Sequence, residues 1–368
     1  MNNQQHIKII GGGMAGLSLA LACKTNGIGY DLYEQQAEIT YQNVGLGISA
    51  NIFPILERWG ILEDVKQIGT EIKTFHFVDP GMKPIKSFTM KRPALSVNRR
   101  LFHELLKTKL DSATIHLHSP KTTADFSEND IVISAEGISS ETRKRIYPQI
   151  KLRDSNQILW RGISKIKLTG NFENSYYDFV GNNLRFAIIH LGKDFYSWYM
   201  IKTKKNEEKV TLDKQLLKHY FKDYHPLVAQ VIDQSQQIYF SEISDIKPDK
   251  RKGLKWFVKN NLMIGDAIHP TTPNMANGAC LAMEDSYLLS NLLMDKRIPA
   301  ETIFSKFQKQ RTSKINPIVR QSWMLGKILH QKSTLVNYLL KVALKVTPEW
   351  FFNQTYSKVL VEVKAEDC

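Results

Sequence analysis

The first residues with the types and spacing for chemistry form a glycine-rich turn near the start of the chain. Gly11, Gly13 and Gly16 follow the apolar run HIKII in the pattern G-x-G-x-x-G, and the small-residue run LSLALACKTN comes next. In such a turn the first glycine permits a tight bend, the second lets the backbone approach a pyrophosphate, and the third lets helix and strand pack closely. Glu34 closes the next apolar run, YDLYE, where an acidic side chain can accept hydrogen bonds from an adenosine ribose. These spacings predict a dinucleotide site and leave NAD and FAD both open.

The second such stretch is GDAIHPTTPNMANGACLAMEDS (265–286), which places one carboxylate, then a stiff loop, then the start of a helix. A helix start gathers free N–H groups and partial positive charge, so an anionic or electron-rich group can lie against it. Asp266 taken alone is better interpreted as an ordinary helix N-cap. His269 has no metal-ligand partner at the usual spacing, and we expect it to bind backbone in a loop rather than act as a catalytic base.

The bulk composition is that of an ordinary globular chain of 368 residues with 42% hydrophobic and 23% charged residues. Its three cysteines are far apart, which argues against disulfides and a zinc site and favours the reducing cytoplasm. The net charge of +14 indicates a solvated basic surface, because no nucleic-acid-binding module accompanies it. We expect no secretory signal and no membrane-spanning helix.

Four stretches, taken in order, resemble the para-hydroxybenzoate hydroxylase-like family of FAD-dependent monooxygenases. They are GLGISANIFPILERWGILEDV (45–65), VNRRLFHELLKTKL (97–110), DIVISAEGISSETRK (130–144) and the Gly-Asp stretch at 265–286. The last stretch, together with WRGI (160–163), resembles most the urate hydroxylase, salicylate hydroxylase and zeaxanthin epoxidase branch. The resemblance runs from about residue 5 to about residue 330, and the order of the motifs makes it more specific than any single motif.

The resemblance implies that FAD is the cofactor. It places Asp266 at the ribityl or ribose part of FAD, the Pro273 loop near the reactive edge of the flavin ring, and Arg99 at the flavin or its diphosphate. Arg99 taken alone is also consistent with a solvated helix residue. The complete set of cofactor residues that the resemblance implies is Gly11, Gly13, Ala15, Gly16, Glu34, Gly47, Ile48, Arg99, Gly265, Asp266, Pro273, Ala276, Asn277 and Gly278.

The chain departs from the family pattern in three places. Glu136 stands where the family has Asp in its Asp-Gly motif, so the charge is kept and moved by one methylene. Ala276 and Asn277 stand where Gly-Gln is usual, which adds a Cβ close to the expected flavin. The span from Leu110 to Asp130 is short, so we expect a trimmed strand meander there.

The resemblance also implies a reaction. NADPH or NADH would reduce FAD transiently, O2 would form a flavin C4a-hydroperoxide, and one oxygen atom would pass to a small aromatic or heteroaromatic substrate. The alternatives are an epoxidase or hydroxylase of a larger apolar substrate such as an isoprenoid, quinone or polyketide, and a flavin oxidase or reductase without oxygen insertion. Arg161 and Arg185 are candidate substrate residues, although Arg161 suits a structural ion pair equally well. No catalytic residue is assigned, because the flavin carries the hard chemistry.

The elements that must position these residues predict a mixed α/β fold. We expect a Rossmann-like FAD-binding domain over 1–74, 95–155 and 261–300, interleaved with a β-sheet substrate domain over 75–94 and 156–260. A C-terminal helical region would follow over 301–368. Within it, residues 326–346 are amphipathic and basic, which predicts a helix that packs on the body or, alternatively, touches anionic lipid. The oligomeric state is left open.

Overall fold

The apolar run before the glycine turn forms β1, at the centre of a six-stranded sheet with strand order β13-β14-β7-β1-β2-β6. The computed structural model describes residues 6–39, 41–204, 212–330, 333–351 and 353. β1 pairs in parallel with β2 and β7, and β7 pairs in parallel with β14, so their carboxyl ends meet at one edge of the sheet. The bounds of these strands are β1 (His6–Ile10), β2 (Gly29–Tyr33), β6 (Ile115–His116), β7 (Ile131–Ser134), β13 (Phe257–Val258) and β14 (Asn261–Met263).

Helix α1 (Met14–Thr25) follows the glycine turn and packs between β1 and helix α8 (Gly278–Leu292). Nearly all of α1 is buried, which suits its run of small and apolar residues. The side chain of Ser286 on α8 donates to the carbonyl of Ala15, at 3.1 Å. This contact between two helices distant in sequence brings the middle of α8 beside the first turn of α1.

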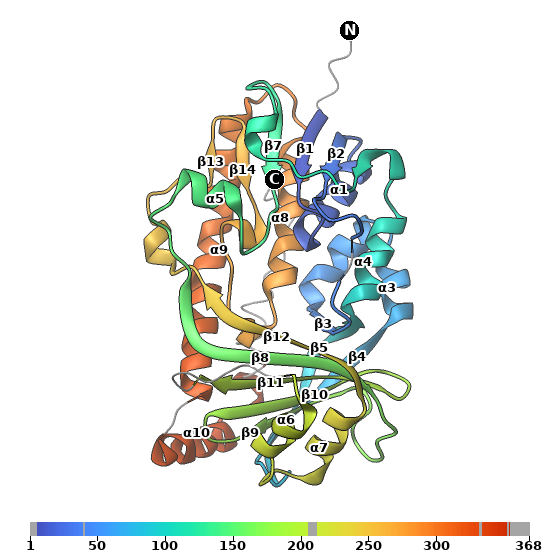
Figure 1. Ribbon diagram of the computed structural model, residues 1–368, viewed down its shortest axis with the longest axis vertical. Coiled ribbons are helices and arrows are strands. Elements are labelled where there is room, and N and C mark those ends of the chain that lie inside the picture. Colours follow the sequence, from blue (N-terminus) through green and yellow to red (C-terminus); the bar gives the residue numbers. More distant parts are fainter. Residues whose placement is uncertain (1–5, 40, 205–211, 331–332, 352, 354–368) are drawn as a thin grey trace.

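A second sheet of eight strands lies across the other half of the molecule, in the order β12-β8-β11-β10-β9-β4-β5-β3 (Figure 1). The hairpin predicted around Pro80-Gly81 joins β4 and β5, and the two runs predicted as neighbours form the antiparallel pair β10 and β11. The bounds are β3 (Gly45–Ile48), β4 (Gly69–Val78), β5 (Pro84–Asn98), β8 (Arg153–Lys165), β9 (Ser175–Val180), β10 (Leu184–Gly192), β11 (Phe195–Thr203) and β12 (Ser235–Asp245).

One face of this sheet is apolar and covered by helices α6 (Lys214–Tyr220) and α7 (Pro226–Asp233). Trp160, Phe186 and Trp198 lie in this second core. Side chains alternate between the two faces of a strand, so their neighbours Arg161, Arg185 and Tyr199 point to the opposite face.

The remaining helices flank the sheets, with α3 and α4 on one side of the view and α5 and α9 on the other (Figure 1). They are α2 (Phe53–Arg58), α3 (Leu62–Ile68), α4 (Arg99–Thr108), α5 (Glu141–Ile146), α9 (Ala300–Leu329) and α10 (Thr334–Val346). Short 3-10 turns are η1 (Ala50–Ile52), η2 (Ser112–Thr114), η3 (Thr123–Asp125), η4 (Pro248–Arg251), η5 (Gly265–Ala267) and η6 (Pro273–Met275).

The mixed α/β class with C-terminal helices is confirmed. The single helix predicted over 326–346 is wrong, because α9 ends at Leu329 and α10 begins at Thr334; Lys332, which lies between them, is outside the described residues. Residues 354–368 of the predicted helical region also lie outside the described part. The division into interleaved domains stays a prediction. Within the described residues, no helix is both long and apolar enough to cross a membrane.

Candidate cofactor and substrate site

The glycine turn lies at the carboxyl end of β1, with strands on both sides. Gly11 has φ of 102°, and a Cβ on it would lie 2.6 Å from the carbonyl oxygen of Ala135, so only glycine suits this position. A Cβ on Gly16 would lie 1.8 Å from the carbonyl oxygen of Gly11. A Cβ on Gly13, in contrast, would meet nothing within 4 Å. The first and third glycines therefore serve the chain's own packing, while the second borders open space.

Glu34 directly follows β2, beside this turn. Its carboxylate accepts hydrogen bonds from the backbone N–H of Gly12, at 2.7 Å, and of Gln36, at 2.9 Å. The hydroxyl of Tyr41 donates to the carbonyl of Gly12, and its ring stacks on His103 with centroids 3.4 Å apart. Burial raises the pKa of Tyr41, so the phenol is neutral. Sequence reasoning missed Tyr41, since a single tyrosine in a loop carries no pattern.

Asp266 lies in η5, which follows β14 at the same edge of the sheet. The residue is exposed, yet burial is the main influence on its carboxyl and raises the pKa. The two observations agree if the carboxyl faces a recess that water reaches and protein surrounds. The charge of Arg99 acts on this carboxyl in the opposite direction, so the two side chains lie near each other. Nε of Arg99 is buried and has no hydrogen-bond partner.

Arg143 on α5 binds the backbone of the loop that contains Asp266. Its Nη1 donates to the carbonyl of Ala267 at 2.7 Å and to that of Asp266 at 3.3 Å. Sequence reasoning noted this arginine only as the trailing Arg of the family's Asp-Gly motif and gave it no role. The structure makes it a positioning residue for the carboxylate.

Glu136 shows how the chain accommodates its departure from the family aspartate. One carboxylate oxygen accepts from the hydroxyls of Ser134 and Ser140, both at 2.5 Å, and from the N–H of Thr142 at 3.1 Å. The longer side chain thereby joins the end of β7 to the first turn of α5. Its charge is held by these donors, at a position one methylene away from that of an aspartate.

The start of α8 approaches β3 on the far side of the recess. A Cβ on Gly47 would lie 4.0 Å from Cβ of Ala276, so these two residues face each other. Ala276 has φ of 48°, a left-handed conformation that explains why glycine is the usual residue there. Asn277 is buried and its Oδ1 has no hydrogen-bond partner. Gly278 begins α8, Pro273 begins η6, and Ile48 is fully buried in the core.

A buried ionic cluster fixes η5, α8 and α9 to one another. Asp285 on α8 accepts from Nε2 of His269 at 2.6 Å, from the N–H of Gly265 at 2.9 Å and from Nε of Arg311 at 2.6 Å. Arg311 also binds Glu284, at 2.9 Å. Burial would raise the pKa of Asp285, but His269 and Arg311 outweigh it and the pKa lies below its usual value. The prediction that the side chain of His269 binds backbone is therefore wrong.

Arg161 lies where the eight-stranded sheet meets the recess. Its Nη2 donates to Oε1 of Gln42 at 2.9 Å, and its Nε is buried without a partner. Burial, together with the charge of Arg99, lowers the pKa of Arg161 to about 10. Arg161 thus lies near Arg99, and the charge of Arg99 also acts on the carboxyl of Asp266. This excess of positive charge favours an anionic or electron-rich ligand.

Arg185 points to the same sheet face but belongs to a different cluster. Its Nε donates to Asp178 at 2.7 Å, its Nη2 contacts the same carboxylate, and both side chains are buried. Tyr199, which is opposite Arg161 in the neighbouring strand, lies with its ring 5.5 Å from the Arg185 guanidinium and shares a hydrogen bond with Tyr176. The two predicted substrate arginines are therefore separated, with Tyr199 between them.

The residues present fit FAD in three respects. Gly13 borders open space at the strand edge where dinucleotides bind in such sheets. Two buried guanidinium nitrogens, Nε of Arg99 and Nε of Arg161, lack partners that an anionic or carbonyl group would supply. Asn277 and the free N–H groups at the start of α8 offer further polar contacts. In the described part of the chain, no group of three or more His, Cys, Asp or Glu side chains is placed to hold a metal.

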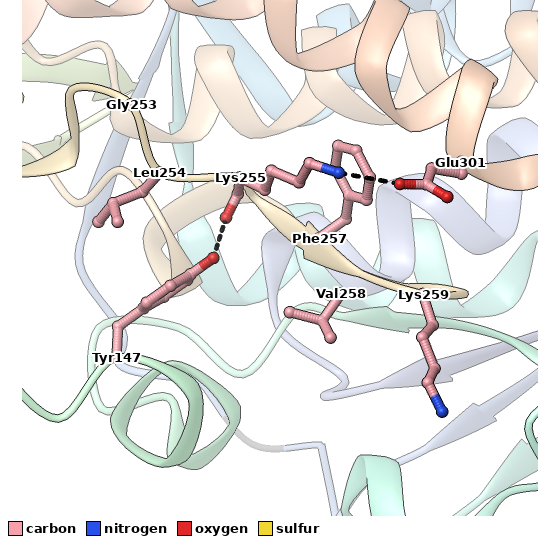
Figure 2. Close-up of a pocket in the computed structure, with 8 residues that line it drawn as sticks. All are labelled: Tyr147, Gly253, Leu254, Lys255, Phe257, Val258, Lys259 and Glu301. Carbon is pink, nitrogen blue, oxygen red and sulfur yellow. Dashed lines mark hydrogen bonds and ion pairs between the residues drawn. The ribbon is translucent and has the colours of Figure 1, made fainter.

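A separate surface recess of about 300 Å³ lies at the edge strand β13 (Figure 2). Tyr147 donates to the carbonyl of Lys255 across it, and Lys255 pairs with Glu301. None of the predicted cofactor or substrate residues lines it. This opening is therefore separate from the predicted cofactor and substrate residues.

Comparison with known proteins of similar sequence supports the interpretation that the chain binds FAD. The chain is 26% identical to the 2-heptyl-3-hydroxy-4(1H)-quinolone synthase of Pseudomonas aeruginosa, over 93% of this chain and 94% of that protein. It is 24% identical to the aurachin C monooxygenase/isomerase of Stigmatella aurantiaca, over 88% and 89%. These relatives confirm the resemblance to the para-hydroxybenzoate hydroxylase-like family of FAD-dependent monooxygenases. No protein-family model matches it.

Solved structures of such monooxygenases share the whole fold. The complex of Klebsiella pneumoniae HpxO with FAD and uric acid superposes with a TM-score of 0.86 at 19% identity, over 98% of this chain and 97% of that one. A salicylate hydroxylase substrate complex gives 0.76 at 17% identity, over 99% and 100%. The fold of the chain therefore matches that of these structures over nearly their whole length. The roles of its individual site residues remain proposals.

Proposed function

We propose that the chain is an NADPH- or NADH-dependent FAD monooxygenase that inserts one oxygen atom of O2 into a small aromatic or heteroaromatic substrate. The observation that carries the proposal is a pair of neighbouring arginines, Arg99 and Arg161, each of which keeps a buried guanidinium nitrogen without a partner. The charge of Arg99 also acts on the carboxyl of Asp266. A cofactor on one side and a substrate on the other would use these two arginines.

On the cofactor side, the backbone N–H groups around Gly13 would hold the diphosphate, and Arg99 would neutralise it. Glu34 would accept from the adenosine ribose, and Asp266 would bind the ribityl or ribose hydroxyls. When bound, the flavin accepts electrons from the nicotinamide and activates O2. The positive end of α8 would stabilise negative charge on the reduced ring.

On the substrate side, Arg161 would orient a polar edge of the ring, and Tyr199 would lie beside it on the same sheet face. Arg185 is held by Asp178, so it would act on the substrate through Tyr199. The 4-quinolone and uric acid in the names of similar proteins are heteroaromatic rings with polar edges. We therefore favour a heteroaromatic ring with N–H or carbonyl groups.

An alkyl-substituted ring is the second candidate. The observation that favours it is the heptyl group in the name of the quinolone synthase. The alignment with that protein covers 93% of this chain. Such a substrate joins a polar ring to an apolar tail and bridges the small-aromatic and larger-apolar alternatives. The C4a-hydroperoxide route and the cytoplasmic location stay predictions.

The decisive experiment measures NADPH and NADH oxidation by the FAD-loaded protein in air, with and without phenols, purines, 4-quinolones and 2-alkyl-4-quinolones. A true substrate accelerates oxidation without equal peroxide release, and its product gains one atom of 18O from 18O2. If every compound gives peroxide equal to the NAD(P)H consumed, the protein is an oxidase or reductase and the proposal fails.

The role of Arg161 is tested with the substrate so found. Arg161→Met should raise KM at least tenfold while bound FAD is unchanged, and Arg161→Lys should recover part of the loss, because it keeps the charge but not the fork of donors. Arg100→Met is the matched control, since Arg100 is exposed and pairs with Glu104 on the surface of α4. Unchanged kinetics in Arg161→Met would remove Arg161 from the substrate site.

A further inference from the structure

Helix α10, near the end of the described chain, exposes apolar side chains and buries a polar one. On α10, Leu335, Leu339 and Val346 are 66%, 55% and 71% exposed, whereas Asn337 on the opposite side is buried. An ordinary surface helix buries its apolar stripe and exposes its polar residues. Here the apolar stripe, which starts at Leu335 and repeats at positions i+4, i+7 and i+11, faces solvent. Packing of α10 on the rest of the protein therefore does not explain this stripe.

The residues after α10 also bury a polar side chain and expose an aromatic one. Asn353 is buried and binds β5 through the N–H of Lys91, at 3.0 Å, and the carbonyl of Thr89, at 3.2 Å. Glu349 accepts from the N–H of Thr89, at 2.7 Å. Trp350, between them in sequence, is 60% exposed. The segment is therefore fixed to the sheet by its polar side chains while its aromatic side chain points outward.

The charges on α10 itself have one sign, while the carboxylate of Glu349 beyond it accepts from the N–H of Thr89. Between residues 302 and 348 the sequence contains lysines and arginines but no Asp or Glu. Lys341 and Lys345 lie along one edge of the outward stripe of α10, next to Tyr338, which is 65% exposed. Leucine and valine flanked by lysine, tyrosine and tryptophan is the composition of helices that lie in a membrane interface.

We propose that this outward face, formed by α10 and Trp350, docks on an anionic lipid surface. Buried apolar area and attraction between lysines and lipid phosphates would both contribute to binding. A second copy of the chain is disfavoured as the occupant, because pairing the stripes would bring the lysines of two copies together. Figure 1 shows α10 at the end of the molecule away from β1 and β2, so docking would leave the cofactor half free.

The test is co-sedimentation of the FAD-loaded full chain with vesicles of phosphatidylcholine containing half phosphatidylglycerol, or of phosphatidylcholine alone. We expect binding to the anionic vesicles at least tenfold tighter than to neutral ones, and weaker binding at 0.5 M NaCl. Leu335→Ser with Leu339→Ser should weaken binding at least tenfold. Lys341→Gln with Lys345→Gln should remove the preference for anionic lipid.

Matched controls are Met294→Ser and Val258→Ser, which change apolar residues 51% and 40% exposed elsewhere and should bind like the wild type. Bound FAD and far-ultraviolet circular dichroism report folding of each variant. A wild type that stays in the supernatant with anionic vesicles overturns the proposal, as does normal binding by the leucine variant. A dimer in sedimentation velocity without lipid, lost in the leucine variant, would assign the face to a second copy instead.

Discussion

Replacement of Arg311 by Met tests whether the buried ionic cluster holds the cofactor edge together. Arg311 is 2% exposed and donates to Asp285 and Glu284, which are themselves 0% and 1% exposed. The variant leaves both carboxylates buried with fewer partners, and breaking such a pair costs about 3–5 kcal/mol. The free energy of unfolding should fall by that amount in urea titrations followed by circular dichroism.

The same variant should weaken FAD binding, because Asp285 also accepts from the N–H of Gly265 at the Gly-Asp loop. Arg320→Met on the same helix is the control, since Arg320 pairs with Asp249 at the exposed surface, where solvent screens the pair and its loss should change stability little. A loss below about 1 kcal/mol in Arg311→Met, or an equal loss in Arg320→Met, would refute the reasoning.

The acid response of the cluster follows from the pKa of Asp285, which lies below its usual 3.8. A lowered folded-state pKa contributes stability that is complete above the unfolded value and is lost as pH falls through the folded one. Arg311→Met removes one of the charges that lower this pKa. Its acid unfolding should therefore begin at a higher pH than that of the wild type.

Three further predictions concern single positions. Gly16→Ala should prevent folding, because its Cβ would meet Gly11 at 1.8 Å, whereas Gly13→Ala should fold and lose FAD affinity in fluorescence titrations; normal FAD affinity in Gly13→Ala would contradict a diphosphate there. Burial acts to raise the pKa of Asp31, but hydrogen bonds from a lysine and two histidines outweigh it and lower the pKa to about 2. Asp31→Asn should therefore lower stability at neutral pH, by less than the about 2 kcal/mol that the full shift corresponds to because solvent screens these charges, and flatten the stability loss as pH falls from about 4 to about 2; a urea titration with no such loss would disprove this. Burial raises the pKa of Cys280, so this thiol should not react with a disulfide reagent at pH 8 until the protein unfolds, as peptide mapping will show.

The sequence by itself determined the features that depend on short-range spacing. The glycine turn and Glu34 predicted the central parallel unit, because a strand, a tight turn and a helix follow one another within a few residues. The order of four motifs predicted the family and the mixed α/β class. A single trailing arginine in one of those motifs, Arg143, was the available signal for the residue that holds the Asp266 loop.

Only the tertiary structure decided which long-range partners meet. Arg161 and Arg185 are indistinguishable as strand arginines, yet the first borders Arg99 at the recess and the second is neutralised by Asp178. His269 found a carboxylate sixteen positions later rather than backbone. The period of α10 predicted an apolar stripe but not its direction, because periodicity does not say which face meets the body. Contacts between elements far apart in the chain fix these choices, and local spacing carries no information about them.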